Sequence, residues 1–255
     1  MLLAIDIGNT NITLGLFYED ILKVTARLAT DPKKTPDEYA ISIKDALALH
    51  GEEAAAIEDC IISSVVPSVA HSVSSAIALL CDTVPLLLGP GVKTGLNIKI
   101  DNPAQLGADL AAGAVGALHE YTMPCIIIDM GTATTISVLD KSGAFLGGTI
   151  GAGVRMTMRA LAEGTAALPA ISIAAPKSVI GKNTVDCMQS GIVLGTAAML
   201  DGIIDRINEE LGESATVVAT GGLARDLVKS CKRDIVYNGE LVLYGLKVLF
   251  EKNKK

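Results

Sequence analysis

Tryptophan is absent from this 255-residue chain, and aromatic residues make up only 3% of it. Basic residues are also scarce. The chain has 21 lysines and arginines against 28 aspartates and glutamates, which gives a formal net charge of −7 at pH 7. A nucleic-acid-binding surface needs clustered positive charge. The composition therefore argues against a nucleic-acid partner.

Paired cysteines and clustered histidines are missing as well. None of the five cysteines forms a Cys-x-x-Cys pair, and each lies in apolar sequence. This pattern is typical of reduced core thiols in a cytoplasmic protein. The three histidines are scattered and lack the spacing of zinc ligands. We therefore expect free thiols and no metal site built on histidine.

A secretory leader is not expected, because no basic residue precedes the first apolar run and Asp6 interrupts that run. Residues 60–81 contain no Asp, Glu, Lys or Arg and are long enough to cross a bilayer. They include Pro67 and six serines, however. We interpret them as a buried strand over 60–66, a break at Pro67 and an amphipathic helix to about residue 81. We expect a cytoplasmic protein without a membrane partner.

Apolar residues make up 50% of the chain, which is enough for one large core or two small ones. Apolar runs predict strands at 2–6, 11–17, 25–28, 60–66, 84–88, 125–129, 134–139, 144–150 and 215–219. Helices are predicted at about 36–50, 68–81, 104–121, 153–163, 184–210 and 239–251, with a solvated tail over 251–255. Because strands and helices alternate, the predicted fold class is α/β.

Two of these helices carry more specific signals. Thr35, Pro36 and Glu38 have the order of an N-cap, a first helical residue and a capping-box partner. In residues 184–210, apolar residues recur at spacings of three and four and predict one stripe of core packing. The residues of this stripe are Met188, Ile192, Gly195, Met199, Ile203 and Ile207.

The clearest feature of the sequence is an internal repeat. The opening, MLLAIDIGNTNITLGLF, and residues 125–139, CIIIDMGTATTISVL, share one design. Each is an apolar strand ending in Asp, then one residue, a Gly, small polar residues and a second strand. The repeat predicts two halves of similar design, which we place at residues 1–115 and 116–255. Interfaces between domains are favoured ligand sites, and we expect a nucleotide cleft between the halves.

Each copy taken singly has two interpretations. One is a plain hairpin in which Gly supplies a positive φ and Asp caps the turn. The other is a phosphate-binding turn. Asp6 and Asp129 would then face a cation across the cleft, while Gly8 and Gly131 let phosphate oxygens approach the backbone. Hydrogen bonds to the phosphates would come from Asn9, Thr10, Thr13, Thr132, Thr134 and Thr135. The repetition favours the second interpretation, with a polyphosphate and its Mg²⁺ held from both sides.

Two further segments suit the same chemistry. In ATGGLARDL, residues 219–227, Gly221 and Gly222 permit close approach of the backbone to a flat adenine, although a plain strand–helix turn would read alike. In NPAQLGADLAAG, residues 102–113, Asp109 stands at an apolar helix start. There it is either a cap or the general base that accepts the proton of an attacking hydroxyl.

With these segments in place, the chain resembles the type III pantothenate kinases, members of the superfamily of actin, sugar kinases and heat-shock ATPases. The matching pieces are DIGNTNIT (6–13), NPAQLGAD (102–109), DMGTATT (129–135), GGTI (147–150), GKNTVDCMQSG (181–191), ATGGLA (219–224) and LVLYGL (241–246). The resemblance implies two duplicated ribonuclease-H-like domains with a nucleotide cleft between them. It also implies ATP-dependent phosphorylation of pantothenate to 4'-phosphopantothenate, the first step of coenzyme A biosynthesis, by a cytoplasmic homodimer.

The resemblance further implies roles for residues at matching positions. Asp109 would be the catalytic proton acceptor, Asp129 would lie at a monovalent cation (K⁺ or NH₄⁺), and Asp6 would hold Mg²⁺ through water. The ATP-binding residues would be Asp6, Ile7, Gly8, Asn9, Thr10, Asn11, Ile12, Thr13 and Thr132, joined by Gly221 and Gly222. Pantothenate would contact Ile100, Gly107, Ala108, Asp109, Leu110 and Thr184.

The acceptor side departs from the family's usual pattern. Leu110 stands where the family commonly has an Arg, and Leu cannot pair with the pantothenate carboxylate. Ile100 lies near a position that is often aromatic, and Ala152-Gly153 replaces the usual Pro-Gly. Two alternatives therefore stay open. They are a kinase for another small hydroxy acceptor and a nucleotide-binding regulator with impaired catalysis.

Overall fold

The computed structural model describes residues 1–254, which form two compact units with one five-stranded sheet each. Unit 1 contains residues 1–96, residues 101–119 and the chain from Leu241 onward. Unit 2 contains residues 97–100 and 120–240. The chain therefore enters unit 2 and returns to unit 1 before it ends.

The sheet of unit 1 has the order β3-β2-β1-β4-β5. Its strands are Leu2–Ile7 (β1), Asn11–Tyr18 (β2), Ile21–Ala29 (β3), Asp59–Ser64 (β4) and Leu86–Leu87 (β5). Its helices are Pro36–Ala48 (α1), Pro67–Cys81 (α2), Ala108–Glu120 (α3) and Leu241–Asn253 (α7), with short 3₁₀ turns at Ala54–Ala56 and Pro103–Gln105. The central strand β1 pairs antiparallel with β2 and parallel with β4.

The sheet of unit 2 repeats this design, with the order β10-β9-β6-β7-β8. Its strands are Cys125–Met130 (β6), Ala133–Leu139 (β7), Phe145–Ala152 (β8), Thr216–Thr220 (β9) and Val236–Tyr237 (β10). Its helices are Val154–Glu163 (α4), Thr184–Leu211 (α5) and Ala224–Leu227 (α6), followed by a 3₁₀ turn at Val228–Ser230. Counted from the first strand of each unit, both sheets run third, second, first, fourth, fifth. The α/β class and the duplicated ribonuclease-H-like design are confirmed.

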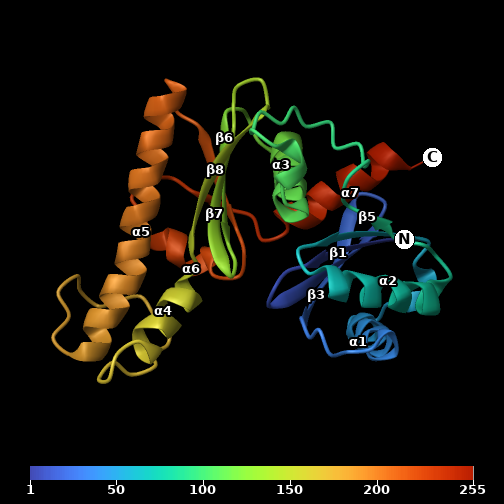
Figure 1. The fold of residues 1–255 in the computed structure, drawn as a ribbon, viewed down its shortest axis with the longest axis horizontal. Helices are drawn as coiled ribbons and strands as arrows, with labels where there is room; N and C mark the ends of the chain where they lie inside the picture. The colour runs from blue at the N-terminus through green and yellow to red at the C-terminus, as the bar shows by residue number, and fades with distance from the viewer. Residues whose placement is uncertain (255) are drawn as a thin grey trace. The chain divides into compact units, whose positions relative to one another are not determined.

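Helices cover both faces of the unit 1 sheet (Figure 1). α1 and α2 lie side by side over one face, where Ile5 and Ile62 share a buried cluster with Ile43 of α1. α3 and α7 pack on the other face, where Ala4 and Ile61 are buried. Burial on both faces explains why these strands read as nearly continuous apolar runs.

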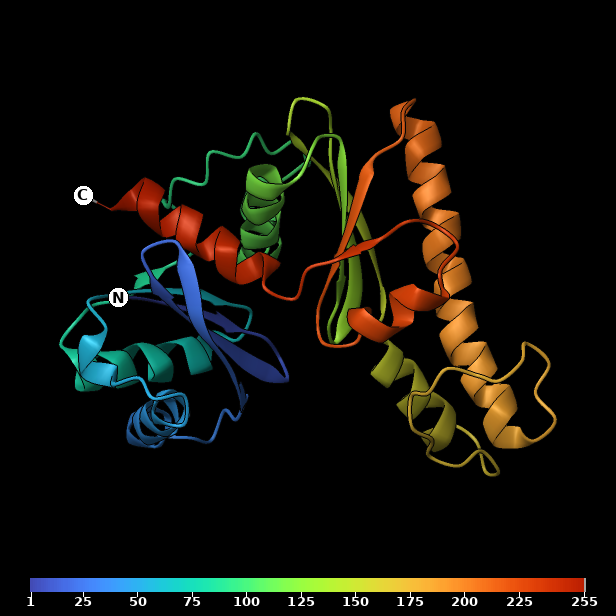
Figure 2. The ribbon, with the colours of Figure 1, turned by 180° about the vertical axis from the view of Figure 1, so that it is seen from behind.

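Two glycines allow α3 and α7 to pack closely, and Figure 2 shows the two helices lying against each other. A Cβ on Gly245 would overlap the Ala112 carbonyl oxygen, and a Cβ on Gly116 would overlap the Leu241 carbonyl oxygen. Larger residues at either place would push the helices apart. The contact fixes the position of α3, which carries Asp109 in its first turn.

The C-terminal helix α7 belongs to unit 1 although it ends the chain. Leu243, Leu246 and Leu249 are buried in the cluster that also contains Ala4 and Phe17. By packing, α7 therefore completes the first half of the molecule. The boundary between residues 115 and 116 stays a prediction about where the duplicated segments meet.

α5 and α6 lie over one face of the unit 2 sheet, and α4 extends beyond the ends of the strands, as Figure 2 shows. Ile126 and Ile128 of β6 lie there in one buried cluster with Leu200 of α5 and Leu227 of α6. Val154, the first residue of α4, joins the same buried cluster. Within residues 1–254, α5 is the one helix with the length and apolar composition that a membrane span needs. Its packing in this cluster gives a second reason for that apolar composition.

Most of the predicted elements are present. Residues 60–81 divide into strand β4 and a helix that begins at Pro67, as expected. The capping box is also confirmed: Glu38 N–H donates to Thr35 Oγ1 at 3.3 Å, and Thr35 N–H donates to Glu38 Oε2 at 2.8 Å.

Three predicted details are wrong. The helix expected from residue 104 begins at Ala108, because residues 103–105 form a 3₁₀ turn capped by the Asn102 side chain. Residues 251–253 are helical, and the Asn253 amide donates to the Leu249 carbonyl oxygen at 2.8 Å. On α5, Met199 is 39% exposed. The fully buried apolar residues of that helix are Met188, Ile192, Val193, Ala197, Leu200 and Ile204.

The stripe on α5 is a single one, slightly rotated from the predicted positions. The predicted Ile203 and Ile207 are partly buried against the sheet cluster, beside the buried Leu200 and Ile204. The spacing of three and four residues was therefore predicted correctly, and the residues assigned to it were correct in part.

Candidate active site

The turn between β1 and β2 is rigid and presents polar side chains. The Gly8 N–H donates to the Asn11 carbonyl oxygen at 3.0 Å and closes the turn. Thr30 then holds it from β3's end: its Oγ1 donates to the Gly8 carbonyl oxygen at 2.7 Å, and its N–H donates to the Thr10 carbonyl oxygen at 3.0 Å. Residues 9–11 are exposed. Because three of its carbonyl oxygens already accept hydrogen bonds, the turn offers mainly donors to a ligand.

The turn between β6 and β7 has a similar construction and is one residue shorter. The Gly131 N–H donates to the Ala133 carbonyl oxygen at 3.0 Å. Thr132 is exposed at its tip. A Cβ on Gly153, at the start of α4, would overlap the Thr132 carbonyl oxygen, so α4 begins directly against the turn. Each turn therefore has a neighbouring segment packed against it: Thr30 at the first turn and the start of α4 at the second.

The glycines of these turns are not needed for backbone conformation. The described residues with positive φ include Gly221 and Gly212 but neither Gly8 nor Gly131. The interpretation in which these two glycines supply a positive φ is therefore wrong. A Cβ on Gly8 would lie 3.2 Å from the Asn11 carbonyl oxygen, and one on Gly131 would lie 3.7 Å from Asp129 Oδ1. Absence of a side chain beside the carboxylate is what Gly131 contributes.

Gly221 holds the end of β9 against Asp129. Its φ is +93°, and a Cβ there would lie 2.7 Å from both Asp129 Oδ1 and the Met130 carbonyl oxygen. An L-residue would be strained and would also displace the carboxylate. The Gly221-Gly222 turn and the strand-end carboxylate, which the sequence shows far apart, are thus brought into contact.

Strand register adds two residues that the sequence analysis missed. Asp6 pairs with Thr13 on β2 and with Ser63 on β4. Asp129 pairs with Thr135 on β7 and with Thr220 on β9. Ser63 and Thr220 are buried, at 0% and 3% exposure. A hydroxyl residue at the end of each apolar parallel strand is the signal that could have found them.

Asp109 lies in unit 1, the unit that also contains Asp6. It is half-buried in the first turn of α3, and its Oδ1 accepts the Leu110 N–H at 2.8 Å. A Cβ on Gly107 would lie 2.6 Å from that oxygen. Gly107 and the Leu110 N–H therefore lie beside the carboxylate.

The other two predicted acceptor residues, Ile100 and Thr184, belong to unit 2. Residues 97–100 extend the sheet there, because the Lys99 N–H donates to the Phe145 carbonyl oxygen at 2.8 Å. An ion pair of 2.8 Å between Lys99 and Asp140 secures the segment. The Lys99 ammonium and the Ser142 hydroxyl hold the pKa of Asp140 well below its usual range. Thr184 is exposed at the start of α5.

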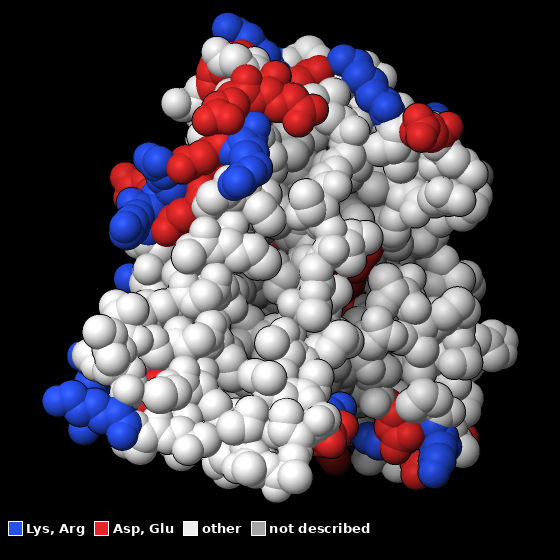
Figure 3. Space-filling model, turned by 60° about the vertical axis from the view of Figure 1, so that its left-hand side comes forward, with Lys and Arg blue, Asp and Glu red and all other residues white. Residues whose placement is uncertain are grey.

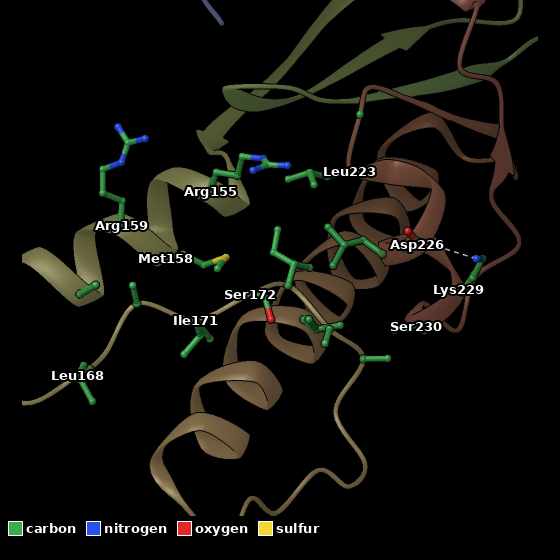
Figure 4. Close-up of a pocket in the computed structure, with 18 of the residues that line it drawn as sticks. Arg155, Met158, Arg159, Leu168, Ile171, Ser172, Leu223, Asp226, Lys229 and Ser230 are labelled. Atoms are coloured by element: carbon green, nitrogen blue, oxygen red, sulfur yellow. Dashed lines mark hydrogen bonds and ion pairs between the residues drawn. The ribbon is translucent and has the colours of Figure 1, made fainter. Parts of the chain in front are cut away.

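Unit 2 also contains a pocket of about 1250 Å³ beside the Gly221-Gly222 turn. Arg155, Met158 and Arg159 line it from α4, and Gly222 and Leu223 line it from the turn, as Figure 4 shows for the labelled residues among them. The opposite wall comes from residues 168–175 of the connection between α4 and α5. The lining combines apolar walls with three cationic groups and two carboxylates, those of Glu163 and Asp226. Apolar walls with a few polar groups suit a flat base attached to a sugar. Of this lining, sequence reasoning found Gly222 alone.

The thiols do not take part in this chemistry. All five cysteines are free, and burial raises the pKa of Cys125 to about 12 and that of Cys231 to about 11. Such thiols are poor nucleophiles because the thiolate is the reactive form. Cys187 is exposed, which differs from the core position that its apolar neighbours indicate.

Comparison with known proteins decides the family. The profile described as "Type III pantothenate kinase" matches residues 2–206. The chain belongs to the type III pantothenate kinase family. A type III pantothenate kinase from Exiguobacterium sibiricum is 43% identical to this kinase over 254 residues, with 100% of each chain covered. The activity is therefore ATP-dependent phosphorylation of pantothenate in coenzyme A synthesis, with ATP and a divalent metal ion, as the sequence predicted.

Solved structures share the fold of this kinase. A protein described as a Baf family transcriptional activator from Campylobacter jejuni gives a TM-score of 0.62 at 17% identity, with 98% of each chain covered. Component A of (R)-2-hydroxyglutaryl-CoA dehydratase from Acidaminococcus fermentans gives 0.60 at 14% identity, covering 99% of this chain and 98% of the other. At these identities the likeness shows the fold alone.

The Gly221 contact predicts a large effect of one methyl group. Gly221→Ala should lower turnover about 100-fold, the size typical of a catalytic group moved by roughly 1 Å. Steady-state kinetics with ATP and pantothenate measure it. Gly212→Ala is the matched control, because Gly212 has a φ of +72° but no atom within 4 Å of its would-be Cβ. It should lose stability and keep its turnover; equal losses in the two variants would contradict the prediction.

Proposed function

We propose that residues 6–13 and residues 129–135 bind the ATP phosphates, and that Asp109 accepts the proton of the pantothenate hydroxyl. The observation that carries this proposal is the matching construction of the two turns. Each has a glycine N–H that closes the turn and an Asp paired with a Thr across the hairpin. Asp6, Ile7, Gly8, Asn9, Thr10, Asn11, Ile12 and Thr13 would form the first phosphate loop, and Thr132 would belong to the second.

Asp6 fits a role at Mg²⁺. Within residues 1–254, no group of three or more His, Cys, Asp or Glu side chains is placed to hold a metal ion. Mg²⁺ in kinases is commonly held by one or two carboxylates together with water and the phosphates of the nucleotide. One half-buried carboxylate beside a phosphate loop satisfies that requirement. When bound, the ion would neutralise charge on the transferred phosphoryl group.

Asp109 is the residue we assign to proton transfer. Its Oδ1 accepts the Leu110 N–H, which orients the carboxylate at the start of α3. The close packing at Gly116 and Gly245 holds α3 against the sheet of unit 1, in which Asp6 lies near the end of β1. The residue therefore accepts the hydroxyl proton as the phosphoryl group leaves ATP, and positioning supplies most of the rate enhancement.

We propose that the pocket in unit 2 binds the adenine base of ATP. Gly221 and Gly222 allow the backbone to approach adenine, and Leu223 offers an apolar surface. Arg155 reaches the same pocket from α4, and a guanidinium can stack on a flat ring. On the acceptor side, we propose Ile100, Gly107, Ala108, Leu110 and Thr184 as pantothenate contacts.

Asp129 is proposed as the site of a monovalent cation, K⁺ or NH₄⁺. Its Oδ1 and the Met130 carbonyl oxygen both lie close to Gly221, so two oxygen donors gather at one place. Oxygen donors of this kind suit an alkali cation. When bound, the cation would add positive charge near the phosphates.

A second copy of the kinase is the partner we propose for the exposed side of α5. Figure 3 shows few charged atoms over the middle of the face that contains α5. Val185 and Met199 are exposed on that helix, and a Cβ on Gly191 or Gly195 would meet no atom within 4 Å. Exposed apolar surface of this kind marks protein–protein contact, and small residues let two helices approach closely. We also propose a cytoplasmic location, which suits the five free thiols and which cell fractionation would check.

Removal of the Asp109 carboxylate, the proposed general base, should abolish most of the activity. Asp109→Asn is expected to lower turnover about 10²- to 10⁴-fold with the fold unchanged, because the amide cannot take the proton. An assay of ADP release with pantothenate and a panel of other hydroxy compounds measures it. Asp82→Asn is the control, since Asp82 has a φ of 48° that Asn also tolerates. Rates of Asp109→Asn within about threefold of wild type would refute the assignment.

The cation site predicts a specific salt effect. Replacing K⁺ by Na⁺ at constant ionic strength should lower the turnover of the wild-type kinase. Asp129→Asn should be slow in both salts, because the charge that attracts the cation is gone. Asp205→Asn, at an exposed carboxylate paired with Arg233 at 2.8 Å and outside the pocket lining, should keep the wild-type difference between the salts. An equal turnover of the wild-type kinase in K⁺ and Na⁺ would contradict the proposed cation site.

The dimer proposal predicts that one charge on α5 separates the copies. Met199→Asp should sediment as a monomer in analytical ultracentrifugation, whereas the wild-type kinase should sediment as a dimer. Leu79→Asp, at a residue 64% exposed on α2, should leave the sedimentation coefficient unchanged. A dimer that survives Met199→Asp would place the contact elsewhere.

A further inference from the structure

Ser63 is a buried hydroxyl without a hydrogen bond. The residue lies on β4, its exposure is 0%, and its Oγ has no hydrogen-bond partner among residues 1–254. Its neighbour Ser64 shows what the local backbone can supply: Ser64 Oγ accepts the Val66 N–H at 2.9 Å and donates to the Val66 carbonyl oxygen at 3.1 Å. The isolation of Ser63 is therefore particular to its position.

That position is beside Asp6. In the parallel pairing of β1 with β4, Asp6 is opposite Ser63, and two residues earlier Ala4 is opposite Ile61. Ala4 and Ile61 are buried in the cluster formed with α3 and α7. Because side chains two residues apart share a face of a strand, Asp6 and Ser63 lie on this same face. The helix that carries Asp109 packs over it.

Unit 2 repeats the arrangement. Asp129 is opposite Thr220 in the parallel pairing of β6 with β9, and Thr220 is 3% exposed. Each strand-end Asp thus has a buried hydroxyl residue on the neighbouring parallel strand. The recurrence in two units points to a role tied to the carboxylate and not to the local core.

A buried hydroxyl without a partner lowers the stability of a folded protein, and alanine at such a place is usually as stable or more so. Polar groups retained at a cost in stability are common where a protein meets its ligand. The hydroxyl of Ser63 is a donor, and its nearest ionisable neighbour across the strand pair is a carboxylate, an acceptor.

We propose that Ser63 is a positioning residue for phosphoryl transfer, whose hydroxyl donates to the Asp6 carboxylate when the metal-bound nucleotide is in place. The inference rests on the proposed role of Asp6. A hydrogen bond from O–H to a carboxylate is of the strong, charge-assisted kind. It fixes one carboxylate oxygen and leaves the other directed to the hydrated metal ion, as partners of ligating carboxylates generally do.

Ser63→Ala tests the proposal through two measurements that should move in opposite directions. The melting temperature of the protein without ligands should rise by about 2–4 °C, because the partnerless hydroxyl is gone. The affinity for Mg²⁺ with ADP, measured by calorimetry, should fall about 10- to 100-fold, the usual effect of losing such a partner. Ser64→Ala is the matched control and should melt lower with unchanged Mg²⁺ affinity, since it loses the hydrogen bonds with Val66.

Asp6→Asn separates this inference from the proposed function. If Asp6→Asn keeps wild-type Mg²⁺ affinity, the proposed role of Asp6 fails and the inference fails with it. If Asp6→Asn binds Mg²⁺ weakly and Ser63→Ala binds it normally, only the role of Ser63 is overturned. The double variant Asp6→Asn with Ser63→Ala should be no weaker than Asp6→Asn alone. A fall in melting temperature for Ser63→Ala would show an ordinary structural serine and would also overturn the proposal.

Discussion

Backbone pairing of the first strand in each unit is the constraint on which the site depends. β1 lies between β2 and β4, which gives Asp6 a hydroxyl residue on either side. β6 does the same for Asp129. The register that places these groups also buries Ile5 and Ile7 on the opposite face, under α1 and α2. A shift by one residue would turn Asp6 into that core, so apolar packing and site chemistry select the same pairing.

The parts of the site that were predictable from sequence are local. Asp6 and Gly8 belong to one hairpin, and the repeat at Asp129 and Gly131 made that hairpin recognisable. Ser63 was not predictable, because its significance comes from pairing with a strand more than fifty residues earlier in the chain. The sequence predicted the Gly221-Gly222 side of the proposed base pocket, but its other walls were missed for the same reason. Arg155 and Leu223 meet there only after α4 and the β9 turn are folded.

The roles of glycines were also hard to predict from sequence. The sequence cannot tell whether a glycine is needed for its φ, for the space that it leaves, or for both. Gly221 needs both, whereas Gly245 needs only the space that lets α7 approach α3. Gly8 and Gly131 are absent from the described residues with positive φ, so the turn-type argument was wrong for both. The strands and most helices were predictable because their apolar periodicity reflects burial that one element experiences along its whole length. On α5 the period was predictable, but Met199 was assigned to the buried face and is exposed.

The return of α7 to unit 1 determines when that unit can be finished. The sheet face around Ala4 and Phe17 is completed only by leucines of the final helix. During synthesis on the ribosome, α3 can cover only part of that face, and the rest stays uncovered until residues 241–253 emerge, whereas residues 120–240 of unit 2 are already available. The middle of the chain can therefore fold first, and the amino-terminal half depends on the newest residues to protect its apolar surface from neighbouring chains.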